Sequence, residues 1–253
     1  MTYENLDGRT AVVTGAASGM GAAVATLLAS SGARVALVSR RADRLAELAD
    51  KITADGGRAL AVPVDVTEAA AVAAAAATIR AELGRVDLVV NNAGVMLPTP
   101  ITEGRVDEWQ RMIGTNLTGA LRIAHAFVAD LIAAAADGGP ADLVNVSSIG
   151  ANVVFPNYAV YGATKAALSH FSANLRAELG PADVRVTNLE PGLTDTELGS
   201  HLDNPELSAQ LGGMYASIPA LTSEDVADLV GYVTSRPRRV NLANVVLVPT
   251  RQV

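Results

Sequence analysis

The sequence predicts a single α/β domain in which helices cover both faces of a seven-stranded parallel sheet. Seven β-rich runs alternate with longer stretches of helix-forming residues along the 253-residue chain. The runs are continuously apolar, as in strands that are buried on both faces. No linker rich in Pro, Gly or Ser and no solenoid-type repeat divides the chain, so we expect one domain spanning residues 1–253.

The order of the runs indicates a doubly wound sheet. The predicted strands are residues 10–14, 34–39, 59–64, 86–91, 142–147, 184–189 and 244–249. Helical stretches between strands imply right-handed crossovers and parallel pairing. The alanine-rich stretch at residues 69–80 is predicted to be an exposed helix of strong helix formers, too short to span a membrane.

Composition argues against several classes of protein. The chain has no cysteine, which excludes disulfides, thiolate catalysis and cysteine metal sites. Its formal net charge of −7 argues against a nucleic-acid partner. No apolar run approaches the roughly 18 residues of a membrane span, and the first residues lack the pattern of a signal peptide. We therefore expect a cytoplasmic protein with no membrane partner.

Two long connections interrupt the alternation of strands and helices. Residues 95–101 follow the fourth predicted strand, and residues 193–215 follow the sixth. In open α/β sheets ligands bind beyond the carboxyl ends of the strands, where long loops are often functional. We predict that residues 193–215 form a substrate-binding lid; the alternative is an ordinary surface loop with a short helix.

The first predicted strand leads into a glycine-rich turn with the pattern T-G-x-x-x-G-x-G, whose glycines are Gly15, Gly19 and Gly21. Glycine permits the tight turn, lets the backbone approach a pyrophosphate, and directs a helix N-terminus at it. The position of the turn, between a strand and an alanine-rich helix, favours a nucleotide site over a bare turn. Ser18 and Met20 lie in the same turn and are predicted to contact the nucleotide.

The end of the second predicted strand indicates which dinucleotide is bound. An acidic residue there would bind the ribose 2′-hydroxyl, whereas basic residues would accept a 2′-phosphate. The strand ends in Ser39, Arg40 and Arg41, so the sequence predicts a preference for NADP(H) of about ten- to a thousand-fold. Asp65 and Val66 follow the third strand. Asp65 is placed to accept a hydrogen bond from the adenine amino group and also to cap the next helix, and the two roles are compatible.

Polar residues near the ends of the later strands mark the reacting end of the site. Residues 91–94 read N-N-A-G, and Asn116 lies in the first turn of a predicted helix, where asparagine is usually a cap. Ser148 follows the fifth strand, while Tyr161 and Lys165, four residues apart, share one helix face. An ammonium stabilises a nearby phenolate, and a tuned phenol can protonate a carbonyl oxygen or take the proton back from an alcohol. For such a pair alone, the alternative is a packed tyrosine beneath a snorkelling lysine.

Taken in order, these motifs resemble the short-chain dehydrogenase/reductase family over essentially the whole chain. The resemblance implies a Rossmann sheet, hydride transfer to or from a nicotinamide, and no metal. It makes Tyr161 the acid/base, with Ser148 positioning the substrate oxygen. Lys165 would hold the nicotinamide ribose and lower the pKa of Tyr161, and Asn116 would place a water that links Lys165 to solvent. Further cofactor contacts are implied for Asn91, Asn92, Ala93 and Gly94, and beside the nicotinamide for Pro191, Gly192, Thr194 and Thr196.

A narrower likeness concerns residues 39–48, 190–198 and 245–253. They are similar to a bacterial branch that contains NADP-dependent serine/3-hydroxy acid dehydrogenases and clavulanate-aldehyde reductase. The tail departs from that branch, because Val248 stands where those relatives usually carry arginine. Nothing basic falls within residues 149–160 to bind a carboxylate, so a hydroxy acid is not favoured over a neutral ketone or aldehyde.

The sequence thus predicts an NADP(H)-dependent oxidoreductase that interconverts an alcohol and a ketone or aldehyde. The alternative is a non-catalytic nucleotide sensor or scaffold on the same fold. Such proteins typically lose the tyrosine or the lysine, and this chain keeps both. Small residues along the Tyr161 helix permit close helix approach, and the family resemblance implies a homo-oligomer, either a tetramer or a dimer.

Overall fold

The sheet of this protein has seven parallel strands in the order β3-β2-β1-β4-β5-β6-β7, in a computed structural model that describes residues 3–201 and 205–252. The chain winds outward from β1 to β3 and then returns to place β4 on the other side of β1. This reversal creates the crevice in which doubly wound folds bind ligands. The predicted fold is confirmed. The strands are Thr10–Thr14 (β1), Arg34–Ser39 (β2), Arg58–Pro63 (β3), Leu88–Asn91 (β4), Asp142–Val146 (β5), Arg185–Pro191 (β6) and Asn244–Leu247 (β7).

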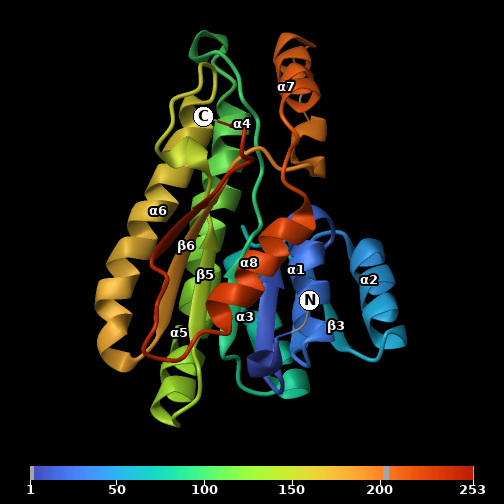
Figure 1. Ribbon diagram of the computed structural model, residues 1–253, viewed down its shortest axis with the longest axis vertical. Coiled ribbons are helices and arrows are strands. Elements are labelled where there is room, and N and C mark those ends of the chain that lie inside the picture. Colours follow the sequence, from blue (N-terminus) through green and yellow to red (C-terminus); the bar gives the residue numbers. More distant parts are fainter. Residues whose placement is uncertain (1–2, 202–204, 253) are drawn as a thin grey trace.

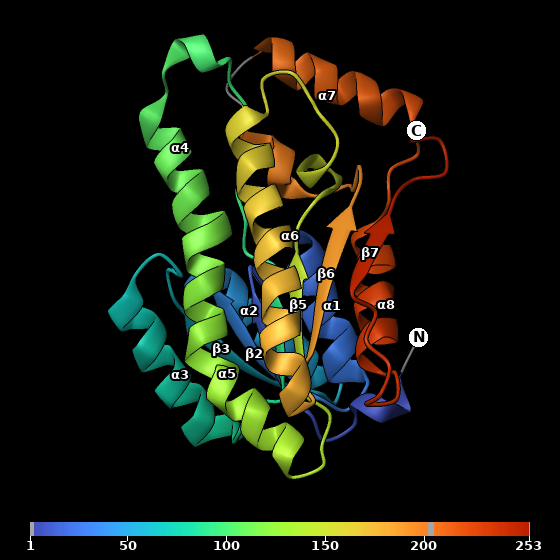
Figure 2. The ribbon, with the colours of Figure 1, turned by 90° about the vertical axis from the view of Figure 1, so that its left-hand side faces the viewer.

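Helices cover both faces of the sheet (Figures 1 and 2). One core packs α3, α5 and the end of α6 against the sheet, and a second core packs α1, α2 and α8 against it. The helices are Gly19–Ser30 (α1), Ala42–Ala54 (α2), Ala69–Leu83 (α3), Val106–Met112 (α4), Ala120–Ala136 (α5), Ala159–Leu179 (α6), Pro205–Ser217 (α7) and Ser223–Thr234 (α8). Short 3-10 turns lie at Glu4–Leu6, Ile101–Glu103, Ile149–Ala151, Gly180–Ala182 and Glu197–His201.

The alanine-rich helix α3 is not the exposed helix that its composition predicts. Val72, Ala76 and Ile79 on one face are buried in the first core, at spacings of three and four residues. Alanine is compatible with either environment, and here the sparse larger residues decide which face turns inward.

A continuous helix runs from Val106 to Ala136 through α4, a π-helical segment at Ile113–Gly119, and α5. We expected a helix to begin near residue 115, and that boundary is wrong. By length and composition alone this helix could cross a membrane. Its buried side chains include Ile123, Phe127 and Leu131, which pack in the first core. A core helix of a globular protein passes the same test, so the finding is no argument for a membrane span.

Buried ion pairs join the amino ends of the central strands. Asp142 at the start of β5 lies 2.7 Å from Nη1 of Arg9 and accepts a 2.8 Å hydrogen bond from Nη2 of Arg185. Arg9 also pairs with Asp87 at 2.7 Å. All of these groups lie at the end of the sheet opposite to the carboxyl ends. The cluster therefore holds the strands in register without reaching the candidate site.

Candidate active site

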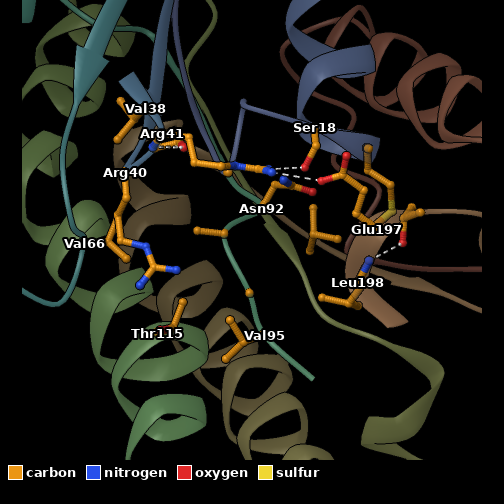
Figure 3. A pocket seen from close by; sticks show the side chains of 18 of the residues that line it. Ser18, Val38, Arg40, Arg41, Val66, Asn92, Val95, Thr115, Glu197 and Leu198 are labelled. Atoms are coloured by element: carbon orange, nitrogen blue, oxygen red, sulfur yellow. Dashed lines mark hydrogen bonds and ion pairs between the residues drawn. The ribbon is translucent and has the colours of Figure 1, made fainter. Parts of the chain in front are cut away.

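A long cavity opens at the carboxyl ends of the strands and runs from the end of β2 to helix α6 (Figure 3). It brings together most of the predicted cofactor residues, namely Gly15, Ser18, Gly19, Met20, Ser39, Arg40, Arg41, Asp65, Val66, Asn92, Ala93, Gly94, Tyr161, Lys165 and Thr196. The sequence did not single out several further residues in its wall, which are Val38, Val64, Val95, Thr115, Val146, Ser147, Glu197 and Leu198. Val95, Glu197 and Leu198 belong to the two long connections after the fourth and sixth strands. Apolar residues at strand ends, such as Val38, Val64 and Val146, carry no chemical signature, so only the fold could place them here.

The glycine turn forms the floor of this cavity. Gly15 has φ +68° and Gly19 has φ +52°, values at which other residues are strained. Gly21 does not line the cavity; a Cβ there would overlap the carbonyl oxygen of Gly15. Gly21 therefore permits close packing of α1 against the turn, and Gly15 permits close packing against Asn92 and Ala93. Gly15 and Gly19 line the floor with backbone alone.

The two arginines after β2 behave differently. Arg40 is 65% exposed and lies 3.9 Å from Asp65. Arg41 reaches across the cavity, as Figure 3 shows, and donates hydrogen bonds to Oγ of Ser18 and, at 2.9 Å, to Glu197. The hydrogen bond from Arg41 is the main cause that lowers the pKa of the Glu197 carboxyl. Arg41, rather than Arg40, is thus the better fixed cation of the cavity wall.

Asp65 is not the N-cap of the following helix, because α3 begins at Ala69 and Glu68 occupies the cap position. Its carboxylate instead accepts hydrogen bonds from the backbone and hydroxyl of Thr67, at 2.9 and 2.7 Å. Burial raises its pKa, but these hydrogen bonds and the charge of Arg40 outweigh burial and lower it. The alternative of helix capping is therefore wrong, and Asp65 is a charged group in the cavity wall.

Thr14, at the end of β1, fixes the N-N-A-G stretch. Its hydroxyl accepts hydrogen bonds from the backbone of Asn92 and of Ala93, both at 3.0 Å, and its carbonyl accepts one from the Asn92 side chain. Asn91 does not face the cavity, which corrects the role expected for it. Its amide donates to the carbonyl of Ala120 and to Asn145, inside the core.

Asn116 lies in the middle of the π-helical segment and not at a helix start, so a capping role is wrong for it too. It is fully buried and joined to Val95, accepting from the backbone N–H at 2.8 Å and donating to the carbonyl at 2.9 Å. Its amide also donates to Thr164 of α6. Asn116 therefore holds the loop after β4 against α6, and its contact residue there, Thr164, lies one helical turn after Tyr161.

Tyr161 and Lys165 lie buried on one face of α6, as their spacing predicts. The ammonium of Lys165 donates a 2.9 Å hydrogen bond to the carbonyl of Val146 and lies 5.8 Å from the centre of the Tyr161 ring. Burial lowers the pKa of Lys165 to about 8.

Burial also raises the pKa of Tyr161 to about 12, an effect that a hydrogen bond with Ser148 opposes. We expected Lys165 to lower this pKa, and the protein shows a raised one. The reason is desolvation of the phenolate, combined with an ammonium that points at a backbone carbonyl.

A second cavity adjoins the first, and Tyr161 belongs to the walls of both. Ser148 lies in this second cavity, as do Pro191, Gly192 and Thr194, which were expected beside the nicotinamide. Most of its wall is apolar and comes from segments far apart in the chain, including Met20, Met96, Ile149, Phe155, Leu211 and Met214.

The predicted lid at residues 193–215 contains the 3-10 turn Glu197–His201 and most of α7, while residues 202–204 lie outside the described residues. The hydroxyl of Tyr215 donates a 2.9 Å hydrogen bond to the carbonyl of Thr194, which joins α7 to the strand end. Leu211 and Met214 of α7 line the second cavity. The segment thus supplies part of the wall of the second cavity and, through Glu197, borders the first.

The shape and chemistry of the first cavity fit a nicotinamide dinucleotide. The open floor at Gly15 and Gly19 leaves backbone accessible at the start of α1, where a pyrophosphate is favoured. One buried side-chain atom, Oδ1 of Asn92, has no partner among the described residues and lies in this wall. Arginines stand at one end, and the phenol and ammonium at the other. The fold and this cavity define a dinucleotide-binding enzyme of the doubly wound type.

Comparison with known proteins agrees. The sequence matches the family described as short chain dehydrogenase over residues 9–206. It is 35% identical over 242 residues to sulfoacetaldehyde reductase 2 of Chromohalobacter salexigens, covering 95% of this chain and 94% of that protein. Among solved structures, it is similar to a closed form of serine dehydrogenase complexed with NADP⁺ (TM-score 0.88, 31% identity, 96% of each chain). A 3-ketoacyl-(acyl-carrier-protein) reductase from Brucella melitensis complexed with NADH also matches (TM-score 0.88, 30% identity, 98% of this chain and 100% of that chain). The chain therefore belongs to the short-chain dehydrogenase family and is an oxidoreductase.

Proposed function

We propose that this protein is an NADP(H)-dependent oxidoreductase that interconverts an alcohol and a ketone or aldehyde, with Tyr161 as acid/base. One observation carries the proposal: the buried phenol of Tyr161 stands in the walls of both cavities, beside Ser148 and Lys165. A proton donor at such a junction serves a reaction between two ligands, one in each cavity.

The first cavity would hold the dinucleotide. Gly15, Gly19 and the start of α1 would bind the pyrophosphate, and Arg40 and Arg41 would bind the 2′-phosphate. When bound, the cofactor supplies or accepts a hydride at its nicotinamide ring. The NADP⁺ complex of the similar serine dehydrogenase supports the choice of NADP(H).

The residues at the reacting end would move and hold a proton. Tyr161 keeps its proton at neutral pH, because its pKa is about 12, and can therefore donate it to a carbonyl oxygen. Ser148 lies where its hydroxyl can hold that oxygen next to the phenol. In the reverse direction the phenol must release its proton, which a positive charge nearby favours. Lys165, buried beside the ring, would supply part of that charge and would bind the ribose.

The experiment that tests this proposal uses Tyr161→Phe, which keeps the ring and removes the hydroxyl. We expect turnover of NADPH with a carbonyl substrate to fall by about 10²- to 10⁴-fold, while NADPH fluorescence on binding stays within about threefold of the wild-type affinity. Tyr232→Phe is the matched control, since Tyr232 lies exposed on α8. Turnover that survives in Tyr161→Phe contradicts the acid/base role. Wild-type protein that binds NADPH but reduces no carbonyl would favour the nucleotide sensor.

Association into a dimer or tetramer and a cytoplasmic location remain predictions. Ile113, Leu121 and Ile132 are exposed apolar residues along the helix from Val106 to Ala136, which supports association through the helical face that includes α6. Light scattering at micromolar concentration that finds only monomers would contradict it. The substrate-covering role of residues 193–215 is likewise proposed from the lining of the second cavity.

A further inference from the structure

The second cavity combines an apolar wall with one amide side chain that comes from the end of the chain, Gln252. The cavity also contains Ser148 and Tyr161, so a carbonyl held there would meet the proposed proton donor. The rest of its wall determines what is attached to that carbonyl. A substrate assigned to this cavity rests on the proposed function, because both concern the same site.

None of the described residues that line the second cavity carries a charge. The nearby cations are placed elsewhere. Lys165 lines only the first cavity and points at the carbonyl of Val146, while Arg40 and Arg41 stand at the far end of the first cavity. Arg251, next to Gln252 in sequence, is exposed and is not part of the wall. A carboxylate or sulfonate in this cavity would lose its hydration without gaining a counter-ion, which strongly disfavours binding.

Gln252 is held in one orientation. The backbone N–H of Leu193 donates a 2.8 Å hydrogen bond to Oε1 of Gln252. The amide oxygen must therefore face Leu193, and the Nε2 group is left without a partner among the described residues. A Cβ on Gly192 would overlap Oε1 of Gln252 and would lie 3.0 Å from Val248, so the glycine at 192 makes room for this side chain. The tail after β7 thus places an amide with an unpartnered donor in the wall of a cavity whose other polar side chains carry hydroxyl groups, among them Ser148, Tyr158 and Thr194.

We propose that the substrate is an uncharged ketone or aldehyde with an apolar body and a hydrogen-bond acceptor distant from the reacting carbonyl. The acceptor, such as an ester or ether oxygen, receives a hydrogen bond from Nε2 of Gln252. Gln252 is then a specificity-determining residue, and the tail that carries it forms part of the substrate wall.

The test compares three matched ketones with NADPH at pH 7: methyl 4-oxopentanoate, ionised 4-oxopentanoate and 2-heptanone. For the wild-type protein, kcat/KM for the ester should exceed that for the acid by at least about 100-fold, because the ionised acid enters without a counter-ion. The variant Gln252→Glu keeps an acceptor for Leu193 and removes the donor. It should lower kcat/KM for the ester about tenfold, and change kcat/KM for 2-heptanone less than threefold. A merely structural role would lower both to the same extent.

Gln252→Lys gives the converse measurement, since it places a cation in the wall. In this variant, the ratio of kcat/KM for the ester to kcat/KM for the acid should be at least about tenfold smaller than in the wild type. Arg251→Gln is the control, because it removes an exposed charge beside the tail and should leave all three rates unchanged. The inference would be overturned if wild-type kcat/KM were equal for the ester and the acid. It would also be overturned if Gln252→Glu lowered kcat/KM for the ester and for 2-heptanone by the same factor. If none of the three ketones and no simple aldehyde is reduced although NADPH binds, the proposed function itself fails.

Discussion

Lys165→Met is expected to make the protein more stable at neutral pH while removing its activity. Lys165 is buried, and burial lowers the pKa of its ammonium from 10.5 to about 8. Each pH unit by which a pKa is lowered corresponds to about 1.4 kcal/mol, so keeping this lysine protonated in the folded protein costs about 3 kcal/mol. The substitution also removes the hydrogen bond to the carbonyl of Val146, at about 1 kcal/mol. We therefore expect the free energy of unfolding at pH 7 to rise by about 2 kcal/mol.

The stability gained by Lys165→Met over the wild type should decrease as the pH rises from 8 to 10.5. Below pH 8 the lysine is protonated in both the folded and the unfolded chain, and the full cost applies. Between pH 8 and 10.5 the unfolded chain binds more protons than the folded one, so the wild type becomes more stable relative to the variant as the pH rises. By pH 9.5 the difference between the two proteins should have narrowed by about 2 kcal/mol.

Urea denaturation of both proteins at pH 7 and pH 9.5 measures this difference, since the other titrating groups are shared. Lys51→Met is a matched control, because Lys51 is the chain's one other lysine and is exposed on α2. It should change the free energy of unfolding by less than about 0.5 kcal/mol at either pH. A destabilised Lys165→Met at pH 7, or a difference that does not vary with pH, would refute the reasoning.

Three further predictions concern the cofactor cavity and the framework. Arg41→Gln should weaken NADPH binding by about 5- to 30-fold and leave NADH binding within about twofold of the wild-type affinity, since only NADPH carries the 2′-phosphate. Fluorescence titration of both nucleotides measures the two affinities, and Arg44→Gln is the control. Gly21→Ala should lower the free energy of unfolding by about 1–3 kcal/mol and abolish nucleotide binding, because its Cβ would overlap the carbonyl oxygen of Gly15. Thermal melts with and without NADPH measure both effects. Asp142→Asn should lower the free energy of unfolding by about 3–5 kcal/mol, because Arg9 and Arg185 would lose a buried counter-ion. Chemical denaturation that finds a loss of less than about 1 kcal/mol would contradict this expectation.

The sequence was sufficient to predict the sheet, because each strand is a continuous apolar run whose type and order leave few topologies. It was also sufficient for residues whose chemistry is local. Glycines at fixed spacing and Tyr161 with Lys165 on one helix face lie where the pattern placed them.

The predictions that failed depended on what surrounds a residue. Asn116 looked like a helix cap, but the helix continues through it as a π segment, and its side chain binds the backbone of Val95 instead. The pKa of Tyr161 depends on desolvation by distant segments, which no local pattern reports. Gln252 shares a cavity with Met214 of the predicted lid although 38 positions separate them in the sequence, and nothing at position 252 signals a binding site.

The two cavities differ in how freely their walls could change during evolution or engineering. The first is built largely from strand ends and the turn after β1, so most substitutions there would disturb the sheet that carries them. The apolar wall of the second comes mainly from loops and α7, and its amide from the tail after β7, segments that do not contribute to the central strands. Substrate preference could therefore be redesigned by replacing these peripheral segments, while the nucleotide site and the order of the strands remain as they are.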